Sequence, residues 1–198
     1  MFNGIIFNNG KIKLIKKNKN SIFVGIETNL KINKKEIGSS FSCNGVCLTL
    51  VKIKKNLIFF YVSNETLAKS NLKYLKINHI INLEYSLVFG QKISGHFIQG
   101  HVDTTAKIKK IVSIDKTWVI KLQIFDNNFK KFLVEKASVA INGVSLTVST
   151  VNRKTFTVCA IPHTLKHTNL INLKKKDLVN IEIDIISKYI KKFINEKK

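Results

Sequence analysis

The stretch Asn44-Gly45-Val46-Cys47-Leu48-Thr49 decides the fold, because it recurs 98 residues later as Asn142-Gly143-Val144-Ser145-Leu146-Thr147. In each copy, an Asn-Gly pair typical of a tight hairpin turn precedes a strand that is half buried. The match continues without a gap over 40–84 and 138–182, where 14 of 45 positions are identical. The chain is therefore one structural unit written twice.

Short strands surround both copies of this stretch. Alternating or β-branched runs cover 11–15, 57–62, 117–122 and 155–159. Short strands at a spacing of about 8–12 residues predict an all-β fold with a small closed barrel in each half. Two matching dipeptides interrupt this pattern and are predicted to lie in short helical turns, namely Thr66-Leu67 and Thr164-Leu165.

The halves meet near a cluster of glycines, Gly90, Gly95 and Gly100. Their starts align at a shift of 96 residues, which places Gly4-Ile5-Ile6 opposite Gly100-His101-Val102. We therefore expect a first barrel over 1–96, a second barrel over 97–186 and a separate carboxy-terminal segment over 187–198.

The carboxy-terminal segment has no counterpart in the first half. Apolar residues recur in it at helical spacing, which predicts an amphipathic helix with one apolar stripe. The stripe could pack on its own barrel or against other subunits. Its members are Ile185, Ile186, Tyr189, Ile190, Phe193 and Ile194.

The net charge of +22 could indicate a nucleic-acid-binding protein. However, Arg153 is the only arginine among the 34 basic residues, and proteins that grip phosphates usually use the bidentate fork of arginine. Lysine, isoleucine and asparagine, which A/T-rich codons encode, dominate the composition. Genome composition therefore explains the charge, and no nucleic-acid partner is expected.

Cysteine usage indicates a reducing compartment. Cys43, Cys47 and Cys159 form no CxxC pair and no even set, which argues against a disulfide framework or a zinc site. The amino terminus lacks the features of a signal peptide, and no apolar run is long enough to cross a membrane. A cytoplasmic protein without metal and without a membrane partner is expected.

Several motifs occur in an order that resembles riboflavin synthase. The resemblance runs from Met1 to about Asp184. It rests on Met1-Phe2-x-Gly4-Ile5-Ile6, both Asn-Gly stretches, Glu65-Thr66-Leu67, Gly95-His96-x-x-x-Gly100-His101-Val102-Asp103 and Ile161-Pro162-His163-Thr164-Leu165. Each motif alone is weak, but the ordered set at the spacing of the duplication is specific.

This resemblance implies two six-stranded Greek-key barrels and a homotrimer held partly by the carboxy-terminal helix. It implies an enzyme that converts two molecules of 6,7-dimethyl-8-ribityllumazine into riboflavin and 5-amino-6-(ribitylamino)uracil by moving a four-carbon unit. No cofactor and no metal are implied. Each productive site would lie between the first barrel of one subunit and the second barrel of a neighbour.

The resemblance also implies which residues line the two pockets. The catalytic candidates, for proton transfer or for activating a nucleophile, are Cys47, His101, Ser145, Thr147 and Asp184. The amino-terminal pocket would comprise Gly4, Ile5, Ile6, Ser40, Cys47, Leu48, Thr49, Glu65 and Thr66, with Phe2 near the paired rings. The carboxy-terminal pocket would comprise Gly100, His101, Val102, Lys136, Ser145, Leu146, Thr147, His163, Thr164 and Asp184.

Simpler interpretations exist for some of these residues. Cys47 could be a small core residue, and Thr49 and Thr147 could be ordinary strand residues. His96 and His101 could be solvated loop histidines. A relative that binds a lumazine without converting it is the main functional alternative, but such proteins tend to lose the pocket residues of the second half, which are present here.

Overall fold

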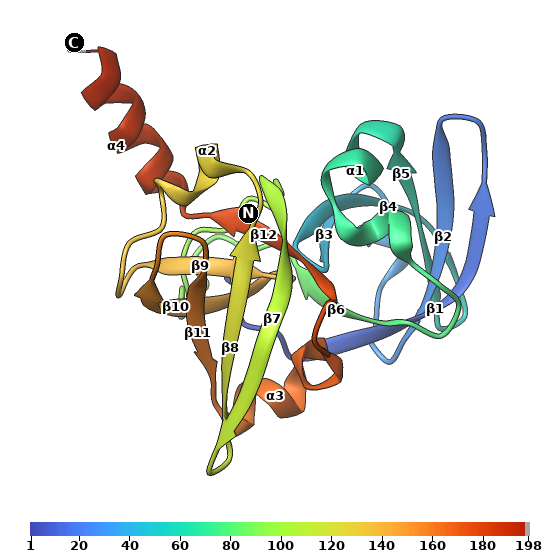
Figure 1. Cartoon of the computed structure of the whole chain (residues 1–198). Helices are drawn as coiled ribbons and strands as arrows, with labels where there is room; N and C mark the ends of the chain where they lie inside the picture. Colours follow the sequence, from blue (N-terminus) through green and yellow to red (C-terminus); the bar gives the residue numbers. More distant parts are fainter. Residues whose placement is uncertain (197–198) are drawn as a thin grey trace.

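A computed structural model of the chain, which describes residues 1–196, contains two closed six-stranded antiparallel barrels side by side (Figure 1). The predicted tandem of barrels is therefore confirmed. The first barrel has the strand order β1-β2-β5-β4-β3-β6, and the second repeats it. The strands are β1 (Asn8–Lys17), β2 (Ser21–Thr28), β3 (Ser40–Cys43), β4 (Val46–Lys54), β5 (Leu57–Ser63), β6 (Ile80–Tyr85), β7 (Thr104–Ile114), β8 (Thr117–Ile124), β9 (Ser138–Ile141), β10 (Val144–Val151), β11 (Phe156–Ala160) and β12 (Leu178–Ile183).

Short helices occupy matching places in the two halves. The predicted helical turns are confirmed as α1 (Asn64–Lys69) with η2 (Asn71–Tyr74), and as α3 (Pro162–His167) with η3 (Asn169–Asn172). Two short elements differ between the halves, η1 (Lys34–Glu36) before β3 and α2 (Asn127–Lys130) before β9.

Each barrel encloses its own apolar core, because side chains alternate between the inside and the outside of a strand. In β5, Ile58, Phe60 and Val62 point into the first core. The terminal segments cross between the cores, however. Ile6, from the start of the chain, belongs to the second core, whereas Val102, from the start of the second half, packs against the first.

The two Asn-Gly turns meet back to back between the barrels. Asn44 and Asn142 have positive φ angles of 50° and 47°, and the glycines that follow have 78° and 79°. A Cβ atom on Gly45 would lie 2.6 Å from the backbone nitrogen of Gly143. Glycine is required at both turns because a side chain on either would collide with the backbone of the other.

An asparagine cluster joins the barrels around these turns, and it consists of three repeat-related pairs: Asn44 and Asn142, Asn71 and Asn169, Asn82 and Asn180. The Asn82 side-chain amide donates to the Asn142 carbonyl at 2.9 Å, and the Asn180 amide donates to the Asn44 carbonyl at 2.8 Å. Both bonds are buried, where an unpaired amide would cost about 1–3 kcal/mol. The reciprocal bonds therefore hold the barrels in an approximately twofold arrangement.

Helix α4 (Ile185–Glu196) projects away from the second barrel (Figure 1). It begins two residues before the segment 187–198 expected from the sequence, and the last two residues of that segment lie outside the described ones. Lys188 pairs with Asp103 of the second barrel at 2.7 Å. The apolar stripe does not pack on the barrel, since Ile186, Tyr189 and Phe193 are each more than half exposed. None of the helices in residues 1–196 is long and apolar enough to cross a membrane.

Candidate functional site: two exchanged glycine loops

The two glycine segments are exchanged between the barrels. The backbone N–H of Ser145, in the second barrel, donates to the carbonyl of Gly4 at 2.9 Å. The N–H of Cys47, in the first barrel, donates to the carbonyl of Gly100 at 2.8 Å. This differs from the grouping expected from the sequence, which placed Gly4 with Cys47 and Gly100 with Ser145. Because the repeats share one pattern, each loop fits either barrel, and chain order does not reveal which one it joins.

Phe2 and Ile98 tie the two loops together where they cross. The N–H of Phe2 donates to the Ile98 carbonyl at 2.7 Å, and the reverse bond measures 3.1 Å. Both side chains are fully buried, and they pack with Ala140 and the partly buried Cys47. The Phe2 ring therefore lies beneath the loops as a support and presents no exposed surface in the isolated chain.

Two glutamates hold the exchanged loops, and they occupy equivalent positions in the repeat. Glu84 of β6 accepts the N–H groups of Asn3 at 2.7 Å and Gly4 at 3.1 Å. Glu182 of β12 accepts the N–H groups of Gln99 at 2.6 Å and Gly100 at 3.0 Å. Burial raises the pKa of the Glu84 carboxyl to about 7 and also raises the pKa of Glu182, while these N–H donors act in the opposite direction.

His96 lies against Ser145, where the loop around Gly4 contacts the second barrel. Its Nδ1 atom is 2.7 Å from the Ser145 hydroxyl oxygen, and the residue is only 9% exposed, so the alternative of a solvated His96 is wrong. The Asn3 side chain fixes the preceding turn by accepting the N–H of Gly95 at 2.6 Å. Burial lowers the pKa of His96, and the nearby charge of Asp184 partly opposes this shift. The imidazole is therefore neutral at neutral pH and can accept the serine proton.

A different set of groups surrounds the contact between the loop around Gly100 and the first barrel. Cys47 takes the place of Ser145 there, and it is partly buried. His101 follows Gly100 and is exposed. His101 corresponds to Ile5 in the other loop at the 96-residue shift, so an imidazole stands where that loop has an apolar side chain. Two identical ligands bound at the two loops would thus meet different proton-transfer groups.

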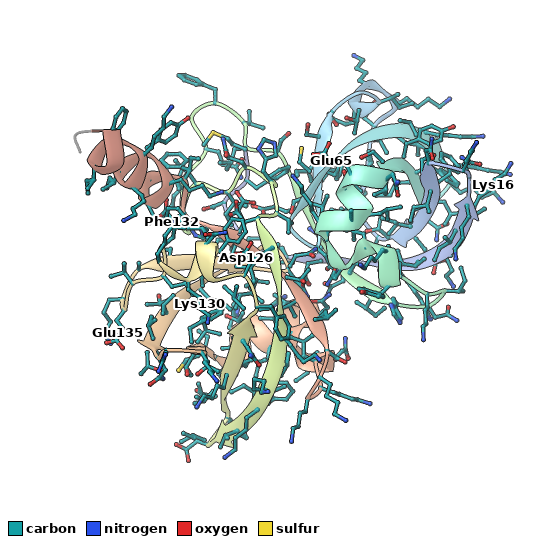
Figure 2. All side chains as sticks on the ribbon, turned by 45° about the horizontal axis from the view of Figure 1, so that its top comes forward. Lys16, Glu65, Asp126, Lys130, Phe132 and Glu135 are labelled. Atoms are coloured by element: carbon teal, nitrogen blue, oxygen red, sulfur yellow. The ribbon has the colours of Figure 1, made fainter. Side chains whose placement is uncertain are left out.

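The predicted pocket residues on β3, β4 and β10, apart from Cys47 and Ser145, fall into two groups. Ser40, Thr49 and Thr147 lie on the outer faces of the barrels, whereas Leu48 and Leu146 point into the cores and can offer a ligand only their backbone. Glu65 lies on α1 at one side of the first barrel (Figure 2), where it pairs with Lys69 at 3.3 Å in an exposed position.

Three further residues predicted for the second pocket come from three different segments of the second half. Lys136 occupies the turn before β9 with a φ angle of 70° and an exposed side chain. His163 is exposed on α3 beside His167, with ring centroids 4.5 Å apart. Asp184 accepts the N–H of Ile186 at 3.0 Å at the start of α4. Within residues 1–196, no three His, Cys, Asp or Glu side chains are grouped as a metal ion would need.

Sequence reasoning missed His96, Asn3, Glu84 and Glu182 as parts of the site. A signal existed for the glutamates, since Glu84 and Glu182 are among the identical positions of the repeat. A carboxylate that recurs in a strand of mostly apolar residues indicates a buried acceptor with a fixed task. His96 did stand in the motif Gly95-His96, but it was not named as a pocket residue, because its role depends on a loop that crosses to the other barrel.

The fold and the exchanged loops define a class of tandem double-barrel proteins in which each half repeats the other. The family model for the lumazine binding domain matches this chain twice, at residues 3–86 and 99–184. The riboflavin synthase of Actinobacillus pleuropneumoniae is 37% identical, over 100% of this chain and 91% of its own length. The riboflavin synthase of Bacillus subtilis is 34% identical, over 99% of this chain and 91% of its own length. The chain belongs to the riboflavin synthase family, with two lumazine-binding domains.

Solved structures of lower identity share the same fold. LumP complexed with riboflavin superposes with a TM-score of 0.83 at 23% identity, covering 92% of this chain and 99% of that one. LumP complexed with 6,7-dimethyl-8-(1'-D-ribityl) lumazine gives a TM-score of 0.80 at 22% identity with the same coverage. These similarities extend the double-barrel architecture to proteins crystallised with lumazine and flavin ligands.

Proposed function

We propose that this protein is a riboflavin synthase, a transferase that dismutates two molecules of 6,7-dimethyl-8-ribityllumazine into riboflavin and 5-amino-6-(ribitylamino)uracil. The observation that carries the proposal is the pair of exchanged loops, Gly4 on Ser145 and Gly100 on Cys47, which gives one chain two related sites. A reaction that consumes two copies of one molecule needs two such sites. Full-length relatives named riboflavin synthase support this assignment.

Orientation of the two substrates is the main catalytic contribution that we propose. Holding two reactants in a productive geometry can account for roughly 7–11 kcal/mol of an activation barrier. A proton must also leave the C7 methyl group of one lumazine, and the other must be activated by a nucleophile. The Ser145 hydroxyl, whose oxygen lies 2.7 Å from His96, is the group that we assign to nucleophilic activation.

We further propose that the protein works as a homotrimer in the cytoplasm, with each site shared between two subunits. The stripe of α4 supports an assembly, because an exposed apolar surface of this kind marks an interaction site. The loop between the barrels adds Val88 and Phe89, which are 73% and 106% exposed. The cytoplasmic assignment rests on the three free cysteines.

Activity should fall on the acid side of neutrality, as His96 gains a proton. The pKa of His96 lies below its ordinary value of 6.5, so the neutral imidazole is present at pH 7 and is lost as pH falls through that lowered pKa. His96→Gln should reduce kcat about 100-fold, the lower end of general-base contributions, and should remove the acid limb of the pH profile. Rates between about pH 5 and pH 8 test this.

His79→Gln is the matched control, because His79 is exposed and its Nδ1 accepts the N–H of nearby Lys76 at 3.3 Å. Its pH profile should coincide with that of the unmodified protein. An acid limb that persists in His96→Gln would assign the titration to another group and overturn the role of His96.

The direct test of the proposed function uses the lumazine as the only substrate. Purified protein should form riboflavin with a yield of half a mole per mole of lumazine, together with an equal amount of the pyrimidine product. Product identity is established by absorption and mass spectrometry. Lumazine that binds stoichiometrically and stays unconverted would overturn the enzyme assignment in favour of a carrier of the same ligand.

A further inference from the structure

Tyr61 stands beside the first-barrel site, on the outer face of β5. Leu50 of β4 pairs with Phe60 of β5, and both point inward, so Thr49 and Tyr61 are neighbours on the outside. Ser40 pairs with Thr49 on the other side. A continuous row therefore runs from Ser40 through Thr49 to Tyr61, and two of its three members are predicted pocket residues.

The row continues through aromatic residues beyond Tyr61. Phe23 of β2 pairs with Tyr61, and their ring centroids are 4.7 Å apart at an angle of 46°. Phe23 in turn stacks on Phe59 at 5.4 Å and 9°. The row ends on β1 at Lys16, at the outer edge of the first barrel (Figure 2).

This packing gives Tyr61 a firm support and an open face. Phe59 is 7% exposed, so the base of the aromatic group is fixed, whereas Tyr61 itself is 58% exposed. A tyrosine held in this way can cover a flat ligand with little loss of side-chain entropy, since only two side-chain torsions are involved. The open face adjoins Thr49, where the first-barrel ligand would lie.

The second barrel provides an internal comparison, because its corresponding row contains no aromatic residue. Ser138 pairs with Thr147, and Val148 pairs with Val158, which places Cys159 beside Thr147. Cys159 then pairs with Val119 of β8. Cys159 and Val119 thus replace Tyr61 and Phe23, while the serine and the threonine of the row are unchanged.

We propose that Tyr61 is a specificity-determining residue of the first-barrel site, where its ring stacks on the bound heteroaromatic ring and makes this site the tighter of the two. The inference rests on the proposed function, because it takes the ligand to be a lumazine or its flavin product. Stacking of a heteroaromatic base on an aromatic side chain is worth about 5- to 150-fold in affinity. Two identical substrates would therefore occupy the barrels in a fixed order.

Riboflavin is the probe for the test, because it is the product and carries the same ring type. Calorimetric titration of the full chain should resolve two classes of site that differ about 10-fold or more in Kd. Tyr61→Ala should weaken the tight class about 10-fold or more, and Tyr61→Phe should preserve it. In steady-state assays, Tyr61→Ala should raise KM and leave kcat within about threefold, a pattern that misfolding would not give.

Cys159→Tyr is the reciprocal variant, and in the Tyr61→Ala background it should move the tighter binding to the second barrel. Two indistinguishable sites in the unmodified protein, or a Kd unchanged by Tyr61→Ala, would overturn the inference. Riboflavin formation from lumazine is measured on the same preparations. If the protein forms riboflavin but its Kd for riboflavin is the same with and without Tyr61, only the role of Tyr61 is rejected. If the tight site depends on Tyr61 but no riboflavin forms, only the proposed enzyme activity is rejected.

Discussion

Gly100→Ala should reduce riboflavin formation at least 100-fold while leaving both barrels folded. A Cβ atom at this position would lie 2.6 Å from the Cβ and 2.8 Å from the backbone nitrogen of Cys47. Neither neighbour can rotate away, since both belong to the strand that the loop covers. The φ angle of +79° adds a strain of about 1–2 kcal/mol for any residue with a side chain. The loop should therefore detach from Cys47, and the first-barrel site should lose its cover.

Gly38→Ala is the control for this variant. Gly38, just before β3, has a φ angle of +97°, but nothing lies within 4 Å of the Cβ that alanine would add. It carries the backbone strain of Gly100→Ala without the collision. Activity, circular dichroism and thermal unfolding are measured on both variants, and only Gly100→Ala should lose activity. Equal losses in both variants would contradict a specific role for the contact between Gly100 and Cys47.

The repeat and its strands could be predicted from the sequence because they depend on local patterns. The Asn-Gly turns require left-handed backbone, and alternation along strands such as 57–62 follows from one face being buried. The short helical turns at Thr66-Leu67 and Thr164-Leu165 occupy equivalent positions, so each copy supported the other. These features need no knowledge of how distant segments pack.

The partners of the loops could not be predicted in the same way. Gly4 contacts Ser145 and Gly100 contacts Cys47 because both loops cross between the barrels, and an uncrossed arrangement would satisfy the same sequence pattern. His96 owes its position to this crossing. A duplicated sequence therefore predicts what each half contains, but it leaves open how the halves exchange parts.

The aromatic row of the first barrel was missed for a related reason. Phe23 and Tyr61 are 38 residues apart and become neighbours only through the pairing of β2 with β5. In the sequence, both look like ordinary strand residues with a high β propensity. Only the strand order, with β2 beside β5, turns two such residues into one surface next to Thr49.

Deletion of residues 187–198 should weaken subunit assembly and lower activity at least 100-fold at micromolar chain concentration. The deletion removes Lys188, which anchors α4 to Asp103 at 2.7 Å, together with most of the apolar stripe. Tyr189, Ile190 and Phe193 are each between 54% and 59% exposed in the isolated chain. Size-exclusion chromatography with light scattering would report the mass, and the lumazine assay would report the rate.

A double variant separates the apolar stripe from the rest of the helix. Ile190→Gln with Phe193→Gln keeps the helix and the pair of Lys188 with Asp103, but it makes the stripe polar. Lys191→Gln, on another face, is its control and should leave mass and rate unchanged. In the double variant, the mass of the assembly and the rate of riboflavin formation should fall together. Two lumazines bound to separate chains would then meet only by diffusion, and the orientation that can account for roughly 7–11 kcal/mol of the barrier would be lost. A stable monomer with full activity would instead mean that both substrates meet on one chain, and sites shared between subunits would have to be abandoned.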